Sequence, residues 1–372
     1  MAVSSTWKRT LLRWSLFAGL LYLFFLSITL MGDAFKGMGR DQVTDILSRA
    51  THNPFTGLLI GILTTAIIQS SSTTTSMVVG FVSGGVLGLR NAIPIIMGAN
   101  IGTTITNALV SLGHARQKAE FQRAFSVAIV HDVFNVITVI ILFPMELSTH
   151  YLERSALFIS DFLVGGSGVS FHSPLTFILK PVASALSDIM TSWFGLMTGS
   201  IVLLVLALAI LITALVLIVK IMKSLVGQKI EASFDGLLSK YGVLGIFIGM
   251  GITAIIQSSS LTTSLLVPMA GAGIITIEAA FPVTLGANIG TTVTALLASM
   301  AGNPTGLAVA LCHLLFNLTG TLIIYPLKPI RRIPVWIAIK LGAKLSQKWY
   351  YAVAFIITLF FILPLTGMVL FG

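Results

Sequence analysis

The chain has 372 residues, of which 56% are hydrophobic and only 9% are charged. Soluble globular domains carry about 25% charged residues, so this composition excludes them and indicates an integral membrane protein. The net charge of +10 does not indicate nucleic-acid binding, because the basic residues mostly lie in short loops between apolar segments, as the positive-inside bias predicts. The single cysteine, Cys312, excludes an intramolecular disulfide.

Seven apolar segments are long enough to span a membrane as helices. The first, Leu11–Met31, is long and has no small-residue cleavage site, so we predict a spanning helix and not a cleaved signal peptide. The others are Ala92–Leu112, Ala124–Met145, Leu196–Met222, Phe281–Met300, Leu307–Leu327 and Trp349–Phe371. Because such segments recur along the whole chain, we predict one polytopic transmembrane domain over residues 1–372.

Two further apolar stretches, Pro54–Leu89 and Tyr241–Ile277, are each interrupted by a Gln-Ser-Ser-Ser run. As a helix, the arm Phe55–Ile68 would be about 21 Å long at ~1.5 Å per residue. It would therefore end inside a hydrocarbon core of about 30 Å. We predict a re-entrant helical hairpin in each stretch, with the tips at Gln69–Thr73 and Gln257–Leu261. Non-helical backbone at that depth must be buried in protein or line a water-filled cavity.

The interrupted stretches belong to an internal duplication. The octapeptide Thr-Ala-Ile-Ile-Gln-Ser-Ser-Ser occurs at Thr65–Ser72 and Thr253–Ser260, and Gly-Ala-Asn-Ile-Gly-Thr-Thr occurs at Gly98–Thr104 and Gly286–Thr292. Both pairs are related by the same offset of 188 residues. We predict repeat 1 over residues 53–146, repeat 2 over 240–328, and an extracytoplasmic or interfacial connection over 147–195. Within that connection Phe171–Trp193 is expected to form an interfacial helix, with coil as the alternative.

Basic residues cluster at every second connection between the predicted spans. The clusters are Arg116, Lys118 and Arg123, then Lys220, Lys223, Lys229 and Lys240, then Lys328, Arg331, Arg332, Lys340, Lys344 and Lys348. This bias predicts a cytoplasmic N-terminus. The two hairpins then enter from opposite sides. The predicted fold class is an all-α polytopic membrane protein with two inverted-topology repeats, each with a re-entrant hairpin and a broken transmembrane helix, as in secondary transporters.

The Gln-Ser-Ser-Ser runs are the first candidate site. A buried hydroxyl or amide without a partner costs roughly 2–7 kcal/mol. The second arm of each hairpin begins at its serines, where the free N–H groups and the helix dipole favour an anion. The residues in question are Ser70, Ser71, Ser72, Ser258, Ser259 and Ser260. The alternative is helix capping or polar packing between helices, but duplication of four consecutive polar residues exceeds what capping requires.

The two Gly-Ala-Asn-Ile-Gly-Thr-Thr segments are the second candidate. Their glycines permit local unwinding that exposes carbonyl oxygens, and side-chain oxygens are added by Asn100, Thr103, Thr104, Asn288, Thr291 and Thr292. Neutral oxygen ligands suit a hard cation such as Na⁺. The alternative is a small-residue packing face between helices.

The helix Ala124–Met145 contains an ionisable residue, Asp132, which in a membrane helix indicates an ion or proton site. Asp132 and Asn135 are three residues apart and share a helical face. At an offset of 182, His313 and Asn317 match His131 and Asn135, but Leu314 replaces Asp132. Asp132 has no basic neighbour in sequence, so Na⁺ is a natural counter-charge. The alternative is an aspartate hydrated near the cytoplasmic interface, and the histidines are interpreted mainly as hydrogen-bonded packing residues.

The doubled motifs, the segment Glu120–Asn135 ending in His-Asp-x-x-Asn, and Ala310–Asn317 resemble the type II sodium-dependent phosphate cotransporters over roughly Asn53 to Trp349. The resemblance implies Na⁺-coupled uptake of inorganic phosphate, with phosphate between the hairpin tips and Na⁺ near them. It also implies that Asp132 and Asn135 take part in Na⁺ binding and that transport is electrogenic. The connection between the repeats is short and lacks cysteines and a glycosylation sequon, which resembles bacterial members. His114 and Gln117 stand where the family has Gln and Asp at an ion site.

Together these observations predict a multi-pass inner-membrane symporter that works by alternating access, with Na⁺ as co-transported ion, no organic cofactor and no nucleic-acid partner. The expected phosphate-binding residues are Ser70, Ser71, Ser72, Ser258, Ser259, Ser260, Asn100 and Asn288. The expected Na⁺ ligands are Gln69, Thr73, Thr103, Thr104, Asp132, Asn135, Gln257, Thr291 and Thr292.

Three alternatives remain open from the sequence. A Na⁺-coupled carrier of sulfate or a dicarboxylate would use the same architecture. A channel is distinguished by its failure to accumulate solute. An intramembrane enzyme using a serine with His131 and Asp132 is disfavoured, because adjacent residues on a helix cannot both orient toward one nucleophile.

Overall fold

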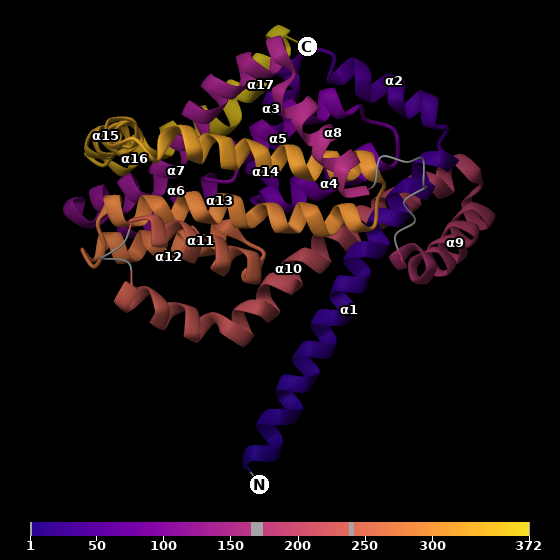
Figure 1. The fold of residues 1–372 in the computed structure, drawn as a ribbon, viewed down its shortest axis with the longest axis horizontal. Helices are drawn as coiled ribbons and strands as arrows, with labels where there is room; N and C mark the ends of the chain where they lie inside the picture. The colour runs from indigo at the N-terminus through magenta and orange to yellow at the C-terminus, as the bar shows by residue number, and fades with distance from the viewer. Residues whose placement is uncertain (1, 165–173, 238–241, 372) are drawn as a thin grey trace.

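The computed structural model describes residues 2–164, 174–237 and 242–371, and within them every regular element is a helix (Figure 1). The first half contains α1 (Ala2–Gly37), α2 (Arg40–Ala50), α3 (Pro54–Ile68), α4 (Ser71–Ser83), α5 (Leu89–Gly102), α6 (Ile105–Ser111), η1 (Leu112–His114), α7 (Lys118–Thr149), α8 (Tyr151–Val164) and α9 (Pro174–Phe194). The second half contains α10 (Leu196–Leu237), α11 (Gly242–Ile256), α12 (Ser259–Gly271), α13 (Ile277–Met300), α14 (Pro304–Ile324), α15 (Lys328–Leu345), α16 (Trp349–Ile357), η2 (Thr358–Ile362) and α17 (Leu363–Phe371).

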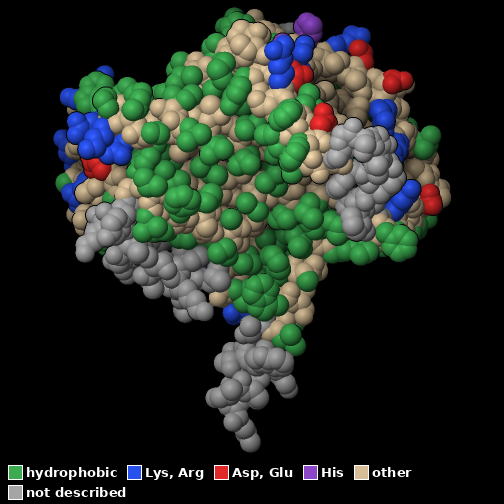
Figure 2. All heavy atoms as spheres, viewed as in Figure 1, with side chains coloured by type: hydrophobic (Ala, Val, Ile, Leu, Met, Phe, Trp, Pro, Cys, Tyr) green, Lys and Arg blue, Asp and Glu red, His purple; other side chains and the backbone are tan. Residues whose placement is uncertain are grey.

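Seven helical segments of the described chain are long and apolar enough to cross a membrane, and they coincide with the seven predicted spans. They are Leu11–Gly37, Leu89–His114, Lys118–Thr149, Leu196–Leu225, Ile277–Met300, Pro304–Ile324 and Trp349–Phe371. The protein is therefore a multi-pass membrane protein. The sixth span ends at Ile324, before the predicted Leu327, because the chain bends there and restarts as α15 with a proline in its first turn. Figure 2 shows hydrophobic side chains across the middle of one face and Lys and Arg gathered at the end that carries α15.

Both interrupted stretches form two helices separated by a short break at the predicted tips. Gln69 adopts a left-handed conformation (φ 59°), and Gln257 does the same (φ 64°). The following residues, Ser70 and Ser258, are extended and cap the next helix, each side chain accepting a backbone N–H at 3.2 Å. Within each pair the two helices are joined by matching hydrogen bonds, Thr65 to Thr74 at 2.9 Å and Thr253 to Thr262 at 2.8 Å. The insertion of these pairs into a membrane as re-entrant hairpins stays a prediction.

The two repeats interlock. Within each repeat the first arm packs on the helix that follows the hairpin: α3 packs on α5, and α11 packs on α13. The second arms pack on the other repeat: α4 lies against α13 and α14, whereas α12 lies against α6 and α7. Helices α7 and α14 approach at equivalent positions, since a Cβ atom on Gly320 would clash with the side chain of Thr138, 182 residues earlier. This exchange is the packing expected of a pseudo-twofold pair. The inversion of the two repeats across a membrane stays a prediction.

The broken transmembrane helix predicted for each repeat is present only in the first. There, α5 ends at Gly102 and α6 begins at Ile105 after two threonines that keep near-helical angles. In the second repeat α13 runs without interruption from Ile277 to Met300, so the predicted unwinding is wrong. The glycines serve close packing. A Cβ atom on Gly98 would meet the backbone of Leu58, and one on Gly286 would meet the backbone of Ile246.

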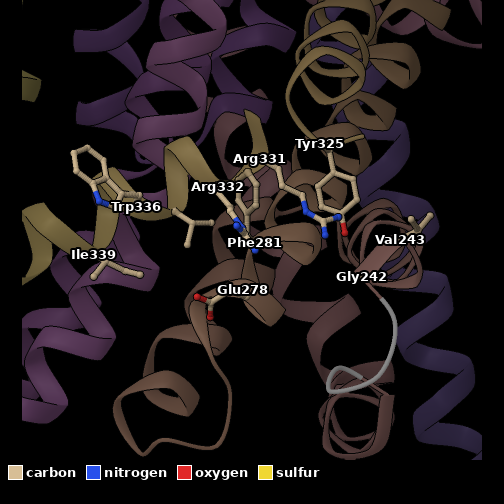
Figure 3. Close-up of a pocket in the computed structure, with 10 residues that line it drawn as sticks. Gly242, Val243, Glu278, Phe281, Tyr325, Arg331, Arg332, Trp336 and Ile339 are labelled. Atoms are coloured by element: carbon tan, nitrogen blue, oxygen red, sulfur yellow. The ribbon is translucent and has the colours of Figure 1, made fainter. Parts of the chain in front are cut away.

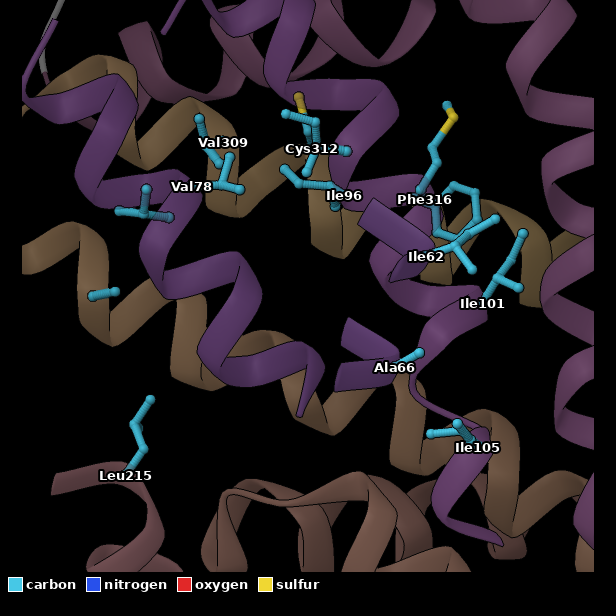
Figure 4. Close-up of a cluster of buried hydrophobic side chains, with 14 of the residues drawn as sticks. Ile62, Ala66, Val78, Ile96, Ile101, Ile105, Leu215, Val309, Cys312 and Phe316 are labelled. Atoms are coloured by element: carbon cyan, nitrogen blue, oxygen red, sulfur yellow. The ribbon is translucent and has the colours of Figure 1, made fainter. Parts of the chain in front are cut away.

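The apolar core lies between the two repeats. Figure 4 shows buried side chains converging from α3 (Ile62), α4 (Val78), α5 (Ile96), α6 (Ile105) and α14 (Phe316). The same core continues to α1, α9 and α10, where α1 packs along α10 and α9 packs against both. The connection predicted as helix or coil is the helix α9, and residues 171–173 of the predicted segment lie outside the described residues.

Candidate functional site

Each repeat reaches across the interface with one histidine to an asparagine of the other repeat. His131 on α7 donates from Nε2 to Oδ1 of Asn288 on α13 at 2.5 Å. His313 on α14 donates from Nε2 to Oδ1 of Asn100 on α5 at 3.3 Å. All four side chains are buried. The two contacts are equivalent under the duplication, so the asparagines of the heptapeptides connect the repeats.

Asn135 extends this connection into a network. Nδ2 of Asn288 donates to Oδ1 of Asn135 at 2.8 Å, and Nδ2 of Asn135 donates to the backbone oxygen of Asn100 at 2.7 Å. The two asparagines of the heptapeptides are thereby linked through α7. Buried hydrogen bonds between helices favour one relative position of the helices that they join. We call His131, Asn135, Asn288, Asn100 and His313 the central network.

Asp132 lies next to the central network without a partner of its own. Its side chain is 2% exposed, and neither carboxylate oxygen accepts a hydrogen bond from any described residue. This burial argues against an aspartate hydrated at the membrane surface. The described chain also leaves Nδ1 of His131, Nδ1 of His313 and Oδ1 of Asn317 without partners. Since His131 and His313 donate from Nε2, their Nδ1 atoms are acceptors. Buried acceptors of this kind are satisfied by ordered water or by a bound cation.

The serines divide into caps and unpartnered hydroxyls. Capping, the alternative considered above, applies to Ser70 and Ser258. The next two serines of each run lie in the first turn of α4 or α12, and no hydrogen bond of the described chain uses their hydroxyls. They are Ser71, Ser72, Ser259 and Ser260, of which all but Ser260 are buried. None of the hydrogen bonds found in the described chain joins the serines of one run to those of the other.

The other expected Na⁺ ligands are mostly engaged. Thr73 donates to Ser70 Oγ at 2.9 Å. The four heptapeptide threonines donate to carbonyls one turn back in their own helices, which leaves the oxygens of Thr103, Thr104, Thr291 and Thr292 able to accept. Gln257 accepts from Thr294 at 2.7 Å and donates to the backbone oxygen of Ala254. Its counterpart Gln69 is exposed and makes no side-chain hydrogen bond within the described residues.

One polar contact was missed by the sequence interpretation. Asn107 on α6 donates to Thr263 on α12 at 2.8 Å, and the threonine hydroxyl lies 3.1 Å from the amide oxygen. Asn107 is a buried amide where the second repeat has Ala295, and this difference between the copies is the signal that points to it.

The family model for Na⁺/Pi-cotransporters matches residues 23–165 and 210–363. The sodium-dependent phosphate transport protein 2B of Pongo abelii is 35% identical over 94% of this chain, and that of Homo sapiens is 34% identical over 94%. The sodium-dependent phosphate transport protein 2A of Rattus norvegicus is 33% identical over 95%. The chain spans 64% of the length of the two 2B relatives and 67% of the 2A relative. No solved structure matches the chain. The chain belongs to the Na⁺/Pi-cotransporter family.

Proposed function

We propose that this protein is a sodium-coupled symporter of inorganic phosphate. The observation that carries the proposal is Asp132, a buried carboxylate beside the central network with no hydrogen-bond partner in the described chain. An uncompensated charge of this kind is costly unless a counter-ion binds. Na⁺ supplies the counter-charge, and the relatives' names as sodium-dependent phosphate transport proteins support this ion and this solute.

Phosphate is proposed to bind at the first turns of α4 and α12. Both are helices of 13 residues that begin just after the break, so the N–H groups of their first turns point toward the break. The four unpartnered serine hydroxyls add donors, and Ser70, Ser258, Asn100 and Asn288 complete the proposed set. In this arrangement backbone N–H groups and hydroxyls, and not Lys or Arg side chains, would stabilise the charge of the phosphate. It leaves part of the anion's charge to be neutralised by Na⁺, which is the physical basis proposed for coupling.

Na⁺ is proposed to bind Asp132 and Asn135, with further oxygens from Gln69, Thr73, Thr103, Thr104, Gln257, Thr291 and Thr292. We propose transport by alternating access, the mechanism of secondary transporters built from two related repeats. We further propose inverted repeats with re-entrant hairpins, a cytoplasmic N-terminus and residence in the cell's inner membrane. The basic residues gathered around α15 support that orientation (Figure 2).

The proposal is tested by uptake of labelled phosphate into proteoliposomes with an inward Na⁺ gradient, an equal K⁺ gradient, or no gradient. We expect accumulation above equilibrium only with Na⁺. Competition by excess sulfate or dicarboxylate in the same assay identifies another anion as the solute. Uptake that merely equilibrates would identify a channel, and Na⁺-independent accumulation would overturn the coupling assigned to Asp132.

A further inference from the structure

A cavity of about 630 Å³ lies away from the central network, between α11, α13 and α15 (Figure 3). Its volume falls in the range of roughly 300–1,000 Å³ found for small-molecule sites. It is lined by apolar side chains together with two arginines, one acid and one tyrosine. The polar members are Arg331, Arg332, Glu278 and Tyr325. The cavity is open on one side, and none of the residues expected to bind phosphate or Na⁺ lines it.

The two arginines are available to an anion. Neither Arg331 nor Arg332 forms an ion pair with any described residue. The Arg331 guanidinium lies over the Tyr325 ring, 5.3 Å from its centroid, in a cation–π contact that positions the group and leaves it without a carboxylate partner. Figure 3 shows both arginine side chains extending into the same space. Glu278 lies in the first turn of α13, where the positive end of the helix dipole favours a carboxylate.

The remaining wall suits a hydrocarbon chain. Trp336 is 61% exposed and Ile339 is 38% exposed, and both lie on α15 beside the buried Val335. Tryptophan is enriched where membrane proteins meet the lipid headgroups. A free phosphate ion would make no use of this surface. A lipid would occupy the charged and the apolar walls together.

The charged residues of the segment that carries the two arginines are all basic. Residues 325–348 contain Lys328, Arg331, Arg332, Lys340, Lys344 and Lys348 and no acidic residue. Basic segments at a membrane surface attract anionic lipids. Arg guanidinium groups bind phosphate oxygens in bidentate fashion.

The corresponding cavity of the first repeat differs in charge. Its volume is about 240 Å³, and it is lined by Pro54, Arg90 and Phe143, which are the counterparts of Gly242, Glu278 and Tyr325. Its arginine, Arg90, is paired with Glu153 at 3.2 Å. Of these two cavities, the one in the second repeat has two guanidinium groups without an ion-pair partner in the described part of the chain.

We propose that the cavity between α11, α13 and α15 binds an anionic phospholipid, with its phosphate at Arg331 and Arg332 and an acyl chain along Val335, Trp336 and Ile339. The bound lipid would fix α15 against α13. This site is independent of the transport site proposed above, since the two share no residue.

Lipid retention by the purified protein tests the proposal. Native mass spectrometry would compare bound phosphatidylglycerol in the wild type, in Arg331→Gln/Arg332→Gln, and in Lys344→Gln/Lys348→Gln. The last variant loses the same charge from exposed positions outside the cavity, in the last turn of α15 and at the start of α16. We expect retention to fall about tenfold or more in the arginine variant, which loses the direct hydrogen bonds to the lipid phosphate. The lysine variant keeps both guanidinium groups, and its retention should fall less than about twofold. Equal losses in the two variants would overturn the proposal.

The lipid source is tested with the wild-type protein. We expect phosphatidylglycerol to be retained in preference to phosphatidylcholine, and millimolar inorganic phosphate not to displace it. Equal retention of both lipids, or displacement by inorganic phosphate, would contradict the assignment. Val243→Trp, which fills the cavity from α11 without changing charge, gives a second route should the arginine variant not fold. It too is expected to release the lipid, and undiminished retention would count against the site.

Discussion

In α7 the first repeat carries Asp132 between His131 and Asn135, whereas in α14 the second repeat carries Leu314 between His313 and Asn317. The histidines behave alike in both repeats, each bonding an asparagine of the other repeat. Their neighbours do not. Asn135 joins the central network, whereas Asn317 donates only to the backbone of its own helix, and its amide oxygen has no partner in the described chain.

The same contrast recurs at the hairpins. The caps at Ser70 and Ser258 are nearly superimposable in their backbone angles. However, Asn107 bonds Thr263, whereas Ala295 replaces that asparagine and the counterpart hydroxyl of Thr75 has no partner. The duplicated features therefore build the frame, and the differences place a buried charge in one repeat only. If the buried carboxylate binds an ion, this asymmetry places that ion site in the first repeat and not in the second.

The largest effect is expected for Asp132→Asn, which makes α7 resemble α14 in lacking a charge. If the carboxylate is a Na⁺ ligand, the apparent Na⁺ affinity for uptake should fall by about tenfold or more, and the charge moved per phosphate should decrease. In Na⁺-free buffer the variant should be more stable than the wild type, because an unpartnered buried carboxylate has been removed. Proteoliposome uptake at set voltages and thermal unfolding in detergent measure the two effects.

The matched control is Leu314→Asn, which introduces the same amide at the equivalent position of the second repeat. Here we expect loss of stability from burying an amide in place of an apolar residue, and an unchanged Na⁺ dependence in the protein that folds. If both variants alter Na⁺ dependence equally, or if neither does, the assignment of the ion site to the first repeat is wrong.

A smaller difference is expected between the two network asparagines. Asn288→Ala removes partners from both His131 and Asn135 and should cost about 2–6 kcal/mol, since each of the two unsatisfied buried groups costs about 1–3 kcal/mol. Asn100→Ala removes the longer contact with His313 and a bond to the backbone oxygen of Ile96 in the same helix. It should cost about 1–2 kcal/mol, because Asn135 bonds the Asn100 backbone and keeps its partner. Denaturant titration in mixed micelles ranks the two, and an equal cost would show that the network is not asymmetric.

The threonines of the second arms give a third comparison. Thr263→Val leaves the buried amide of Asn107 without its partner, and we expect a loss of about 1–3 kcal/mol. Thr75→Val removes a hydroxyl that has no partner in the described chain, so the change should stay within about 0.5 kcal/mol or stabilise the protein. The same micelle titration measures both. A large loss at Thr75 would reveal a partner there, such as a bound ion or water.

Most of the helical framework could be predicted because membrane spans depend on local composition. The breaks at Gln69 and Gln257 were predictable because a polar run cannot continue an apolar helix cheaply, and serine is a preferred cap. The continuity of α13 could not be predicted from the sequence. Glycine permits both unwinding and close packing, and only the position of α11, a tertiary feature, decides between them.

The sequence shows which residues are candidates for the site, but it does not show which of them contact one another. The charge of Asp132 and the duplicated serines are visible in sequence, but the exchange of histidine and asparagine between repeats is not. His131 and Asn288 are 157 residues apart, and their contact depends on how α7 and α13 pack. The sequence interpretation also gave the asparagines to phosphate, without anticipating that their side chains hold the repeats together.

The smallest expected effect concerns the two left-handed glutamines. A non-glycine residue at positive φ is strained by roughly 1 kcal/mol or more, so glycine at either position relieves strain. Gln257→Gly also loses the 2.7 Å bond with Thr294, and we expect it to be destabilised by about 0.5–1.5 kcal/mol. Gln69→Gly loses no hydrogen bond of the described chain and should be unchanged or more stable by up to about 1 kcal/mol. Reduced phosphate uptake in a Gln69→Gly protein of undiminished stability would indicate that strain is kept there for the exposed amide, whereas full activity would remove Gln69 from the proposed Na⁺ ligands.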